Sequence, residues 1–301
     1  MKPSDSRSFG LFCLLVTSVG WGINWPVVKI VLADWPPLFA RGLSGIAAAI
    51  AIGLLVTLRG ESLLVPRAIV PRLMRAAAIN VFCWMGLSTL ALSWLDAGEG
   101  ALLVYTMPIW AVLLAWPMQG IKPGAASVAA LVLGMAGLAV LLGGQEMAVG
   151  VGKLPGVLLA LAAAFAFALG TVAGWSQLPL SPLVSVTWQV GLGCLPMLAI
   201  GLLFEKPEFG ALGGAGWAAM TYMTVVPMGL CYLTWFEALR RLPATTASTA
   251  TLLVPVIGVV AAAVVLGESL GPAKLAALAL TLGGVTLAMR ESARSRRKNL
   301  R

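Results

Sequence analysis

Long apolar segments recur along the whole chain and constrain its fold more than any other feature. Ten can be counted, and each approaches the roughly 20 residues that an α-helix needs to cross a lipid bilayer. Lipid offers no partner for backbone N–H and C=O groups, so each segment is expected to be a helix. The expected spans are 9–32, 36–58, 73–94, 97–117, 124–143, 154–175, 182–203, 216–238, 244–266 and 272–289.

The composition agrees with a chain whose solvent is mostly lipid. Of its 301 residues, 60% are hydrophobic and 10% are charged, against roughly 25% charged in an ordinary soluble domain. The chain has no histidine, which excludes histidine catalysis and histidine metal ligation. Its four cysteines lie in apolar stretches without CxxC spacing, so we interpret them as packing residues. The predicted class is an all-α integral membrane protein with no metal and no cofactor.

The distribution of charge predicts the orientation of the helices. With the N-terminus inside and the segments alternating, most of the 20 lysines and arginines fall in inside segments, whereas outside loops carry acids. This bias follows the positive-inside rule and places both termini in the cytoplasm, as in a multi-pass protein of the inner (plasma) membrane. The basic tail 291–301 is interpreted as a topology anchor, with anionic-lipid binding or a partner site as alternatives. Nucleic acid is not expected, because this charge is terminal and adjacent to the membrane.

Weak internal similarity divides the chain into two halves, 9–143 and 154–290. A shift of 147 residues aligns Pro108 with Pro255, and a shift of 143 aligns Met85-Gly86-Leu87 with Met228-Gly229-Leu230. Each half holds five segments, and five is odd, so the second half is expected to enter the membrane with opposite polarity. Such inverted repeats occur in transporters whose halves exchange conformations to open a site to either side.

The first segment carries polar and helix-breaking residues at membrane depth. It reads Trp21-Gly22-Ile23-Asn24-Trp25-Pro26, followed by Lys29. Pro26 removes one intrahelical hydrogen bond and frees a carbonyl, and the Asn24 amide needs a partner or a wet cavity. Two interpretations stay open: these residues line a cavity, or they join helices to one another.

The fourth and ninth segments share a central proline, Pro108 and Pro255. Tyr105, Thr106 and Trp110 surround the first proline. Helix-breaking positions that correspond in two repeats indicate a transport site, although simple packing is an alternative.

Few charged residues lie inside the segments. Arg41, about one turn inside the outer boundary, is interpreted either as an interfacial anchor or as a partner for a substrate carboxylate, Asp34 or Asp96. Glu99 is either a proton site or an acid favoured by a helix N-terminus. This scarcity of acids predicts a carrier that is not coupled to protons. No GxSxG, HExxH, kinase or complete P-loop pattern is present, so we expect no enzyme.

Over residues 9–290 the sequence resembles the EamA type of the drug/metabolite transporter superfamily. Within that superfamily it is similar to YddG-type exporters of aromatic and other amino acids. This narrower similarity rests on the overall sequence and on Tyr105 and Trp110, which flank Pro108. The resemblance implies ten helices, an inverted repeat and a cavity built by helices 1, 3, 4, 6, 8 and 9. Gln119-Gly120-Ile121 departs from the family pattern. The residues that carry the resemblance are Trp21-Gly22-x-Asn24 with Lys29, Pro36 and Pro37 with Arg41, Pro108, Pro255, and Gly267-Glu268.

The sequence thus predicts a carrier that exports amino acids or related small metabolites by alternating access without ion coupling. The alternative is a proton-coupled multidrug efflux carrier, with Glu99 as the first candidate for coupling. A lipid enzyme or a structural subunit is the competing class. The expected cavity residues are Trp21, Asn24, Asn80, Trp84, Ser88, Tyr105, Thr106, Trp110, Phe167, Tyr232 and Thr249; the helix-breaking residues are Pro26, Pro108 and Pro255; and the residues expected in ion pairing or coupling are Lys29, Arg41 and Glu99.

Overall fold

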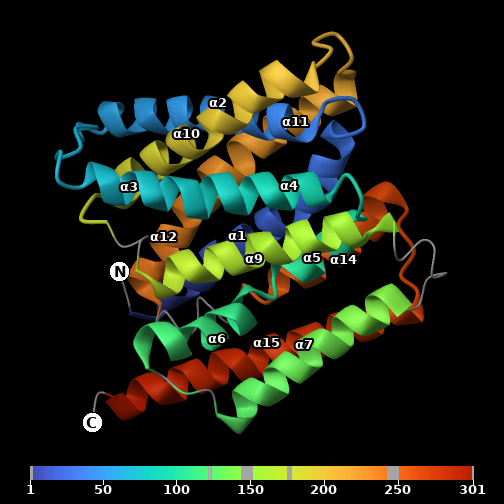
Figure 1. Ribbon diagram of the computed structural model, residues 1–301. Coiled ribbons are helices and arrows are strands. Elements are labelled where there is room, and N and C mark those ends of the chain that lie inside the picture. Colours follow the sequence, from blue (N-terminus) through green and yellow to red (C-terminus); the bar gives the residue numbers. More distant parts are fainter. Residues whose placement is uncertain are drawn as a thin grey trace.

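The apolar segments fold as helices, and the described part of the computed structural model contains no strand (Figure 1). The described residues are 3–120, 122, 124–143, 152–174, 178–242 and 251–299. Six helical stretches are long and apolar enough to cross a membrane. They are Arg7–Val31, Pro37–Leu58, Val70–Ala91, Ala97–Gln119, Leu154–Val172 and Pro182–Glu205.

The helices follow the expected spans with small shifts at their ends. The expected start at 244 falls among residues that are not described, and the segment expected at 97–117 is two helices rather than one. The last helix continues through most of the basic tail. The elements are α1 (Pro3–Val31), α2 (Pro37–Leu58), α3 (Val70–Ala77), η1 (Ala78–Gly86), α4 (Leu87–Ala91), α5 (Ala97–Val104), α6 (Met107–Gln119), α7 (Ala125–Gly143), α9 (Leu154–Val172), α10 (Pro182–Ile200), η2 (Gly201–Glu205), α11 (Gly214–Val225), η3 (Val226–Leu230), α12 (Cys231–Arg241), α14 (Leu253–Leu266) and α15 (Pro272–Asn299).

The helices run back and forth between two ends of different charge. At one end, on the left of Figure 1 with both termini, α2 ends and α3 begins. We call it the basic end, because it exposes Arg59, Arg67, Arg72, Arg75 and Arg240. We call the opposite end, where α1 ends and α5 begins, the carboxylate end; it holds Asp96, Glu99, Glu205 and Glu268.

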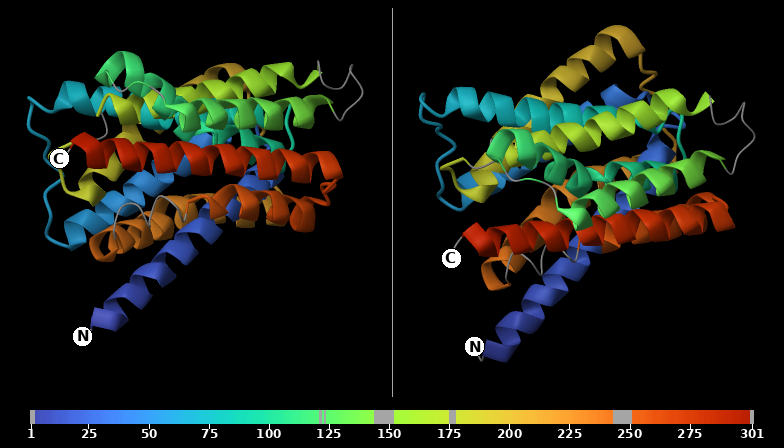
Figure 2. Two further views of the ribbon diagram at one scale, coloured as in Figure 1. Left: turned by 90° about the horizontal axis from the view of Figure 1, so that it is seen from below. Right: turned by 60° about the horizontal axis from the view of Figure 1, so that its bottom comes forward.

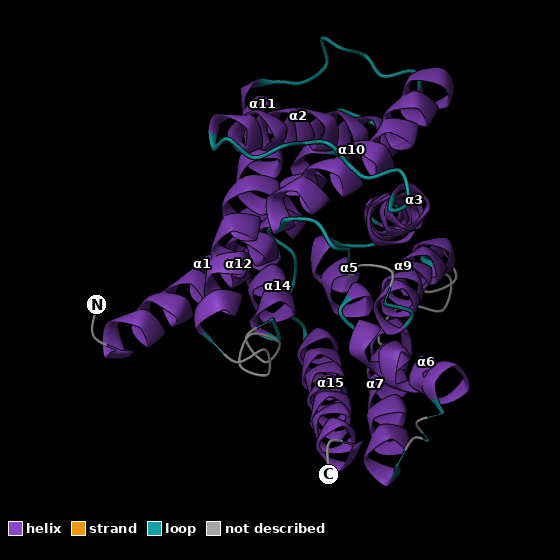
Figure 3. Ribbon diagram, turned by 90° about the vertical axis from the view of Figure 1, so that its left-hand side faces the viewer, coloured by secondary structure: helices purple, strands orange, loops and turns teal. Residues whose placement is uncertain are grey.

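Two pairs of helices form the top and bottom of the bundle in the end-on view of Figure 3, α2 with α10 and α7 with α15. Between them, α1, α12 and α14 lie on one side, and α3, α5 and α9 lie on the other. The first part of α1 projects from the bundle at the basic end (Figure 2). The surface carries large apolar side chains such as Leu58, which is 76% exposed, and Val264, which is 79% exposed. Lipid is the solvent that such a surface requires.

Irregular helical geometry recurs at the positions that the sequence comparison aligned. The π-helical segments η1 and η3 end at Gly86 and Leu230, within the matched Met-Gly-Leu tripeptides. A turn at Tyr105 and Thr106 separates α5 from α6, so Pro108 lies in the first turn of α6. Pro255 likewise lies in the first turn of α14. Proline fits this position because the first N–H groups of a helix have no intrahelical partner. Pro26, by contrast, lies inside α1, which continues past it.

Close contact between α2 and α10 depends on glycine. A Cβ atom at Gly42 would overlap the backbone of Leu198 on α10. A Cβ atom at Gly201 would lie 2.5 Å from the Phe39 nitrogen. Backbone atoms cannot move aside as a side chain can, so the two helices would have to separate.

We therefore predict that Gly42→Ala lowers the free energy of unfolding by about 1–3 kcal/mol through overpacking. Gly191→Ala is the matched control on α10, because its Cβ would lie 3.5 Å from the Ala49 Cβ, an ordinary contact. The melting temperatures of both variants are measured in detergent. A thiol-reactive dye reports unfolding, because it reacts with the buried cysteines once they become exposed. Equal melting temperatures for the two would contradict the proposed close packing.

Candidate functional site

A row of aromatic rings crosses the middle of the bundle. Trp25 on α1 lies 6.4 Å from Tyr105, measured between ring centroids, and Tyr105 lies 6.5 Å from Trp84 on η1. Trp84 in turn lies 4.8 Å from Phe167 on α9. The row therefore connects four elements from both halves of the chain, at the point where α5 breaks and where η1 departs from α-helical geometry.

A second aromatic group joins α1 to α12. The Trp21 ring lies 5.9 Å from Tyr232 and 5.7 Å from Trp235. Its Nε1 donates a hydrogen bond to the Pro227 carbonyl in η3 at 3.1 Å. The Tyr222 hydroxyl donates back to the Gly20 carbonyl at 3.0 Å. Each side of the interface between α1 and the helix that contains η3 thus donates a side-chain hydrogen bond to a backbone carbonyl on the other side.

Two asparagine oxygens in the middle of the bundle lack partners within the described residues. Asn80 Nδ2 donates to Gln189 Oε1 at 3.1 Å, but Asn80 Oδ1 is buried with no hydrogen bond. Asn24 Oδ1 is also buried without one. A buried acceptor without a donor is costly, and it indicates a position that water or a ligand satisfies. Of the two interpretations of Asn24, this geometry favours a lining role.

Two other predicted residues, Ser88 and Trp110, make different contacts. The Ser88 hydroxyl donates to the Met85 carbonyl at 3.2 Å, so it is satisfied within its own helix. Trp110 packs against Phe165, 5.7 Å away. Thr249 lies outside the described residues.

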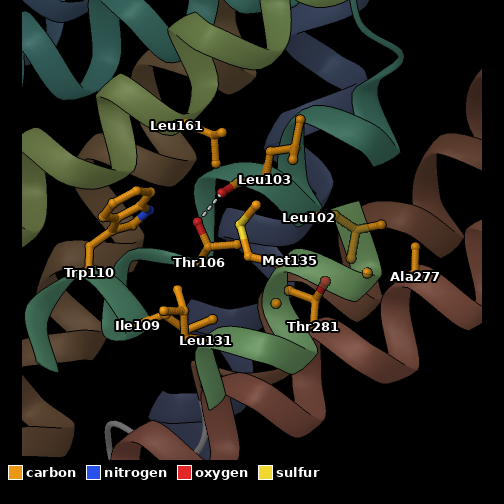
Figure 4. Close-up of a pocket in the computed structure, with 12 residues that line it drawn as sticks. Leu102, Leu103, Thr106, Ile109, Trp110, Leu131, Met135, Leu161, Ala277 and Thr281 are labelled. Carbon is orange, nitrogen blue, oxygen red and sulfur yellow. Dashed lines mark hydrogen bonds between the residues drawn. The ribbon is translucent and has the colours of Figure 1, made fainter. Parts of the chain in front are cut away.

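The pocket in Figure 4 lies between α5, α6, α7, α9 and α15. Its volume is about 180 Å³, below the roughly 300 Å³ at which ligand pockets begin. It includes Thr106, whose hydroxyl donates to the Leu103 carbonyl at 2.6 Å, and Trp110. The other predicted cavity residues do not line it, so we place the candidate site at the aromatic row instead.

Carboxylates at the carboxylate end hold the N-termini of two helices. Glu268, after α14, accepts hydrogen bonds from the Ala97 nitrogen at 2.6 Å and the Gly98 nitrogen at 3.2 Å, at the start of α5. Glu205, at the end of η2, accepts from the Leu38 nitrogen at 3.1 Å and the Phe39 nitrogen at 2.8 Å, at the start of α2. Charge-assisted bonds to a helix N-terminus are among the stronger hydrogen bonds of proteins.

Glu99 is bound within this end rather than free in the middle of the bundle. It closes a capping box with Asp96 at the start of α5 and is 1% exposed. Lys153 Nζ lies 2.9 Å from its carboxylate and 3.5 Å from Asp96. Burial lowers the pKa of Lys153, but its hydrogen bonds to and attraction by Glu99 and Asp96 outweigh burial and raise the pKa overall. Lys153 therefore stays charged at neutral pH.

Lys29 binds backbone carbonyls at the carboxylate end, and its expected part in ion pairing or coupling stays a prediction. Its ammonium donates to the Leu95 carbonyl at 2.8 Å and to the Leu92 carbonyl, just after α4. It thereby occupies carbonyls that the end of that helix leaves open.

Sequence reasoning did not select Lys153, Glu205 or Glu268 as site residues. The sequence indicated Lys29, Glu99 and the Gly267-Glu268 pattern but not their partners, because the contacts join residues far apart in sequence.

The fold and this arrangement define a multi-helix membrane transporter. The model of the EamA-like transporter family matches residues 8–143 and again residues 154–290, so the chain belongs to that family. The chain is 29% identical over 294 residues to "Uncharacterized transporter YvbV" of Bacillus subtilis, covering 94% of this chain and 91% of that protein. It is 28% identical to the "Probable amino-acid metabolite efflux pump" of Salmonella typhimurium, covering 93% and 94%.

Two further matches extend over nearly the whole chain. The chain is 26% identical to the "Probable terminal-alkyne amino-acid exporter" of Streptantibioticus cattleyicolor, covering 97% of each protein. A solved structure titled only "Crystal structure of protein" superposes with a TM-score of 0.65 at 21% identity, covering 97% of this chain and 98% of that one. The family and the names of the relatives point to a multi-pass membrane transporter rather than an enzyme.

We predict that Glu99→Gln lowers the free energy of unfolding by about 2–4 kcal/mol, because it leaves the Lys153 ammonium without its nearest carboxylate. The double variant Glu99→Gln/Lys153→Gln should recover part of that loss. Glu237→Gln is the control, since the pairs of Glu237 with Arg240 and Arg241 are more exposed, and exposed pairs contribute at most about 1 kcal/mol. Equal thermal unfolding of Glu99→Gln and Glu237→Gln would refute the buried pair.

Proposed function

We propose that the chain is a carrier of ten transmembrane helices in two inverted five-helix repeats, residues 9–143 and 154–290. The double match of one family model supports this assignment. So do the packing of α2 on α10 and of α7 on α15, each pairing the same position of the two repeats. The π-helical segments η1 and η3 and the helix starts beside Pro108 and Pro255 correspond in the same way.

Both termini lie in the cytoplasm in this proposal. The support is the excess of arginine at the basic end, which holds both termini, and the preference of basic residues for the cytoplasmic side. The carboxylate end then faces outward.

The proposed activity is export of amino acids, aromatic and apolar ones among them, by alternating access. The observation that carries it is the aromatic row of Trp25, Tyr105, Trp84 and Phe167, together with the buried Asn24 and Asn80 oxygens that have no described partner. The rings suit an apolar side chain, and the amide oxygens suit an ammonium group. The names of two relatives, an amino-acid metabolite efflux pump and an amino-acid exporter, support the same class.

The two ends differ in the strength of their closing contacts. Carboxylates bind backbone amides and Lys153 at the carboxylate end. At the basic end, the Ser181 hydroxyl donates to Glu61 at 2.6 Å, and Gln119 donates to the Val172 carbonyl at 2.9 Å, both at exposed positions. Export requires the contacts of the carboxylate end to break and those of the basic end to tighten.

Transport is facilitative in this proposal, because the one acid that belongs to the candidate set, Glu99, is held by Lys153. The alternative is proton-coupled multidrug efflux, which the burial of Glu99 at 1% exposure favours. In that case Glu99→Gln would abolish drug resistance in cells.

We predict saturable efflux of preloaded L-phenylalanine from proteoliposomes, unchanged when an imposed pH gradient is dissipated. Trp84→Ala should reduce the rate about tenfold, because it removes the ring between Tyr105 and Phe167 at a cost of roughly 1.4 kcal/mol in transport. Trp116→Ala is the control, since Trp116 on α6 is 52% exposed and takes no part in the aromatic row. Absence of saturable efflux for every amino acid tested, with or without a gradient, would refute the proposed function.

A further inference from the structure

Arg41 is a buried cation without a counterion in the described part of the chain. It lies in the second turn of α2 and is 7% exposed. Its Nε and Nη1 atoms are buried and make no hydrogen bond with any described residue. The side chain therefore does not reach the membrane surface as an interfacial anchor would.

Asp34, in the turn after α1, is exposed to solvent, and three carboxylates of the carboxylate end are already engaged. Asp96 contacts Lys153 and Lys274, and Glu205 and Glu268 accept backbone amides. One turn further along α2, Gly45 lies against Cys194 of α10, so the neighbouring side chain on that helix is a thiol rather than a carboxylate. The expected pairing of Arg41 with Asp34 or Asp96 is absent among the described ion pairs.

The helix that carries Arg41 packs against the same region as the aromatic groups. Trp84 and Tyr232 pack against the hydrophobic cluster that α2 forms with η1 and α10, and Tyr232 packs edge-on against Trp21. The helix that carries Arg41 contacts the π-helical segments η1 and η3. Arg41 therefore lies on a helix that packs against the elements of the proposed site.

A guanidinium with open donors is costly at membrane depth, and such residues mark substrate or ion pathways. A carboxylate is the group that repays this cost best, because guanidinium binds it through two parallel hydrogen bonds. Cationic molecules without a carboxylate are repelled by the same charge.

We infer that Arg41 binds the carboxylate of the transported molecule, so that the substrates are carboxylate-bearing amphipathic compounds. The inference rests on the proposed function and deepens it. Arg41 takes the carboxylate, and the aromatic row takes the apolar side chain.

The first test uses the wild-type protein in proteoliposomes with labelled L-phenylalanine. Unlabelled 3-phenylpropionate, which keeps the ring and the carboxylate, is expected to compete with phenylalanine. Phenethylamine, which keeps the ring and the ammonium group, is expected to compete at least tenfold more weakly. Equal competition by phenethylamine would overturn the role of Arg41 while leaving amino acid export intact. No saturable phenylalanine transport at all would overturn the proposed function and the inference together.

The second test separates a ligand-binding arginine from a structural one. Arg41→Gln should melt in detergent no lower than the wild type, because it removes a buried charge that has no described partner. The affinity of Arg41→Gln for phenylalanine, measured by ligand-induced thermal stabilisation, should be at least tenfold lower than that of the wild type. Arg41→Lys should retain part of the wild-type affinity. Arg59→Gln is the matched control, at the exposed C-terminal end of the same helix. Unchanged phenylalanine affinity in Arg41→Gln would overturn the inference, and if that variant does not fold, the competition experiment decides.

Discussion

Lipid cannot hydrogen-bond to a peptide group, and this constraint governs where the helices of this protein are regular and where they are not. At irregular positions a side chain supplies the missing partner. Trp21 donates to the Pro227 carbonyl within η3, and Lys29 donates to the Leu92 and Leu95 carbonyls after α4. Thr106 donates to the Leu103 carbonyl at the break between α5 and α6. The interior polar residues that the sequence suggests as functional therefore fall into two groups. Some donate hydrogen bonds to backbone carbonyls, and the others do not.

This grouping shows which polar residues remain candidates for binding a substrate. Lys29 and Thr106 are satisfied by backbone carbonyls, and Glu99 is satisfied by Lys153. Asn24, Asn80 and Arg41 each keep a buried polar atom with no described partner. Two of these residues offer an acceptor and one offers donors, which is the complement of an ammonium group and a carboxylate. The unpartnered atoms, rather than the number of polar side chains, carry the assignment of substrate chemistry.

The sequence was sufficient for the features that depend on local pattern. Apolar segment length predicted the helices, and the alignment of Pro108 with Pro255 predicted matched irregular positions. It was insufficient where partners are distant along the chain. Glu99 and Lys153 lie 54 positions apart, and Glu205 and Phe39 lie 166 apart. The sequence predicted how far Arg41 lies from the end of α2. It did not predict which face of the helix Arg41 occupies, because α2 is apolar on every side.

The proposed role of Arg41 also bears on how the carrier moves. Alternating access requires two conformations whose free energies differ by only a few kcal/mol. In an empty carrier, closing both ends around Arg41 encloses an uncompensated charge at low dielectric. In the proposed cycle a bound carboxylate would neutralise that charge, so the loaded protein would cross between its two states more easily than the empty one. Selectivity for carboxylates and coupling of motion to occupancy would then arise from the same buried guanidinium.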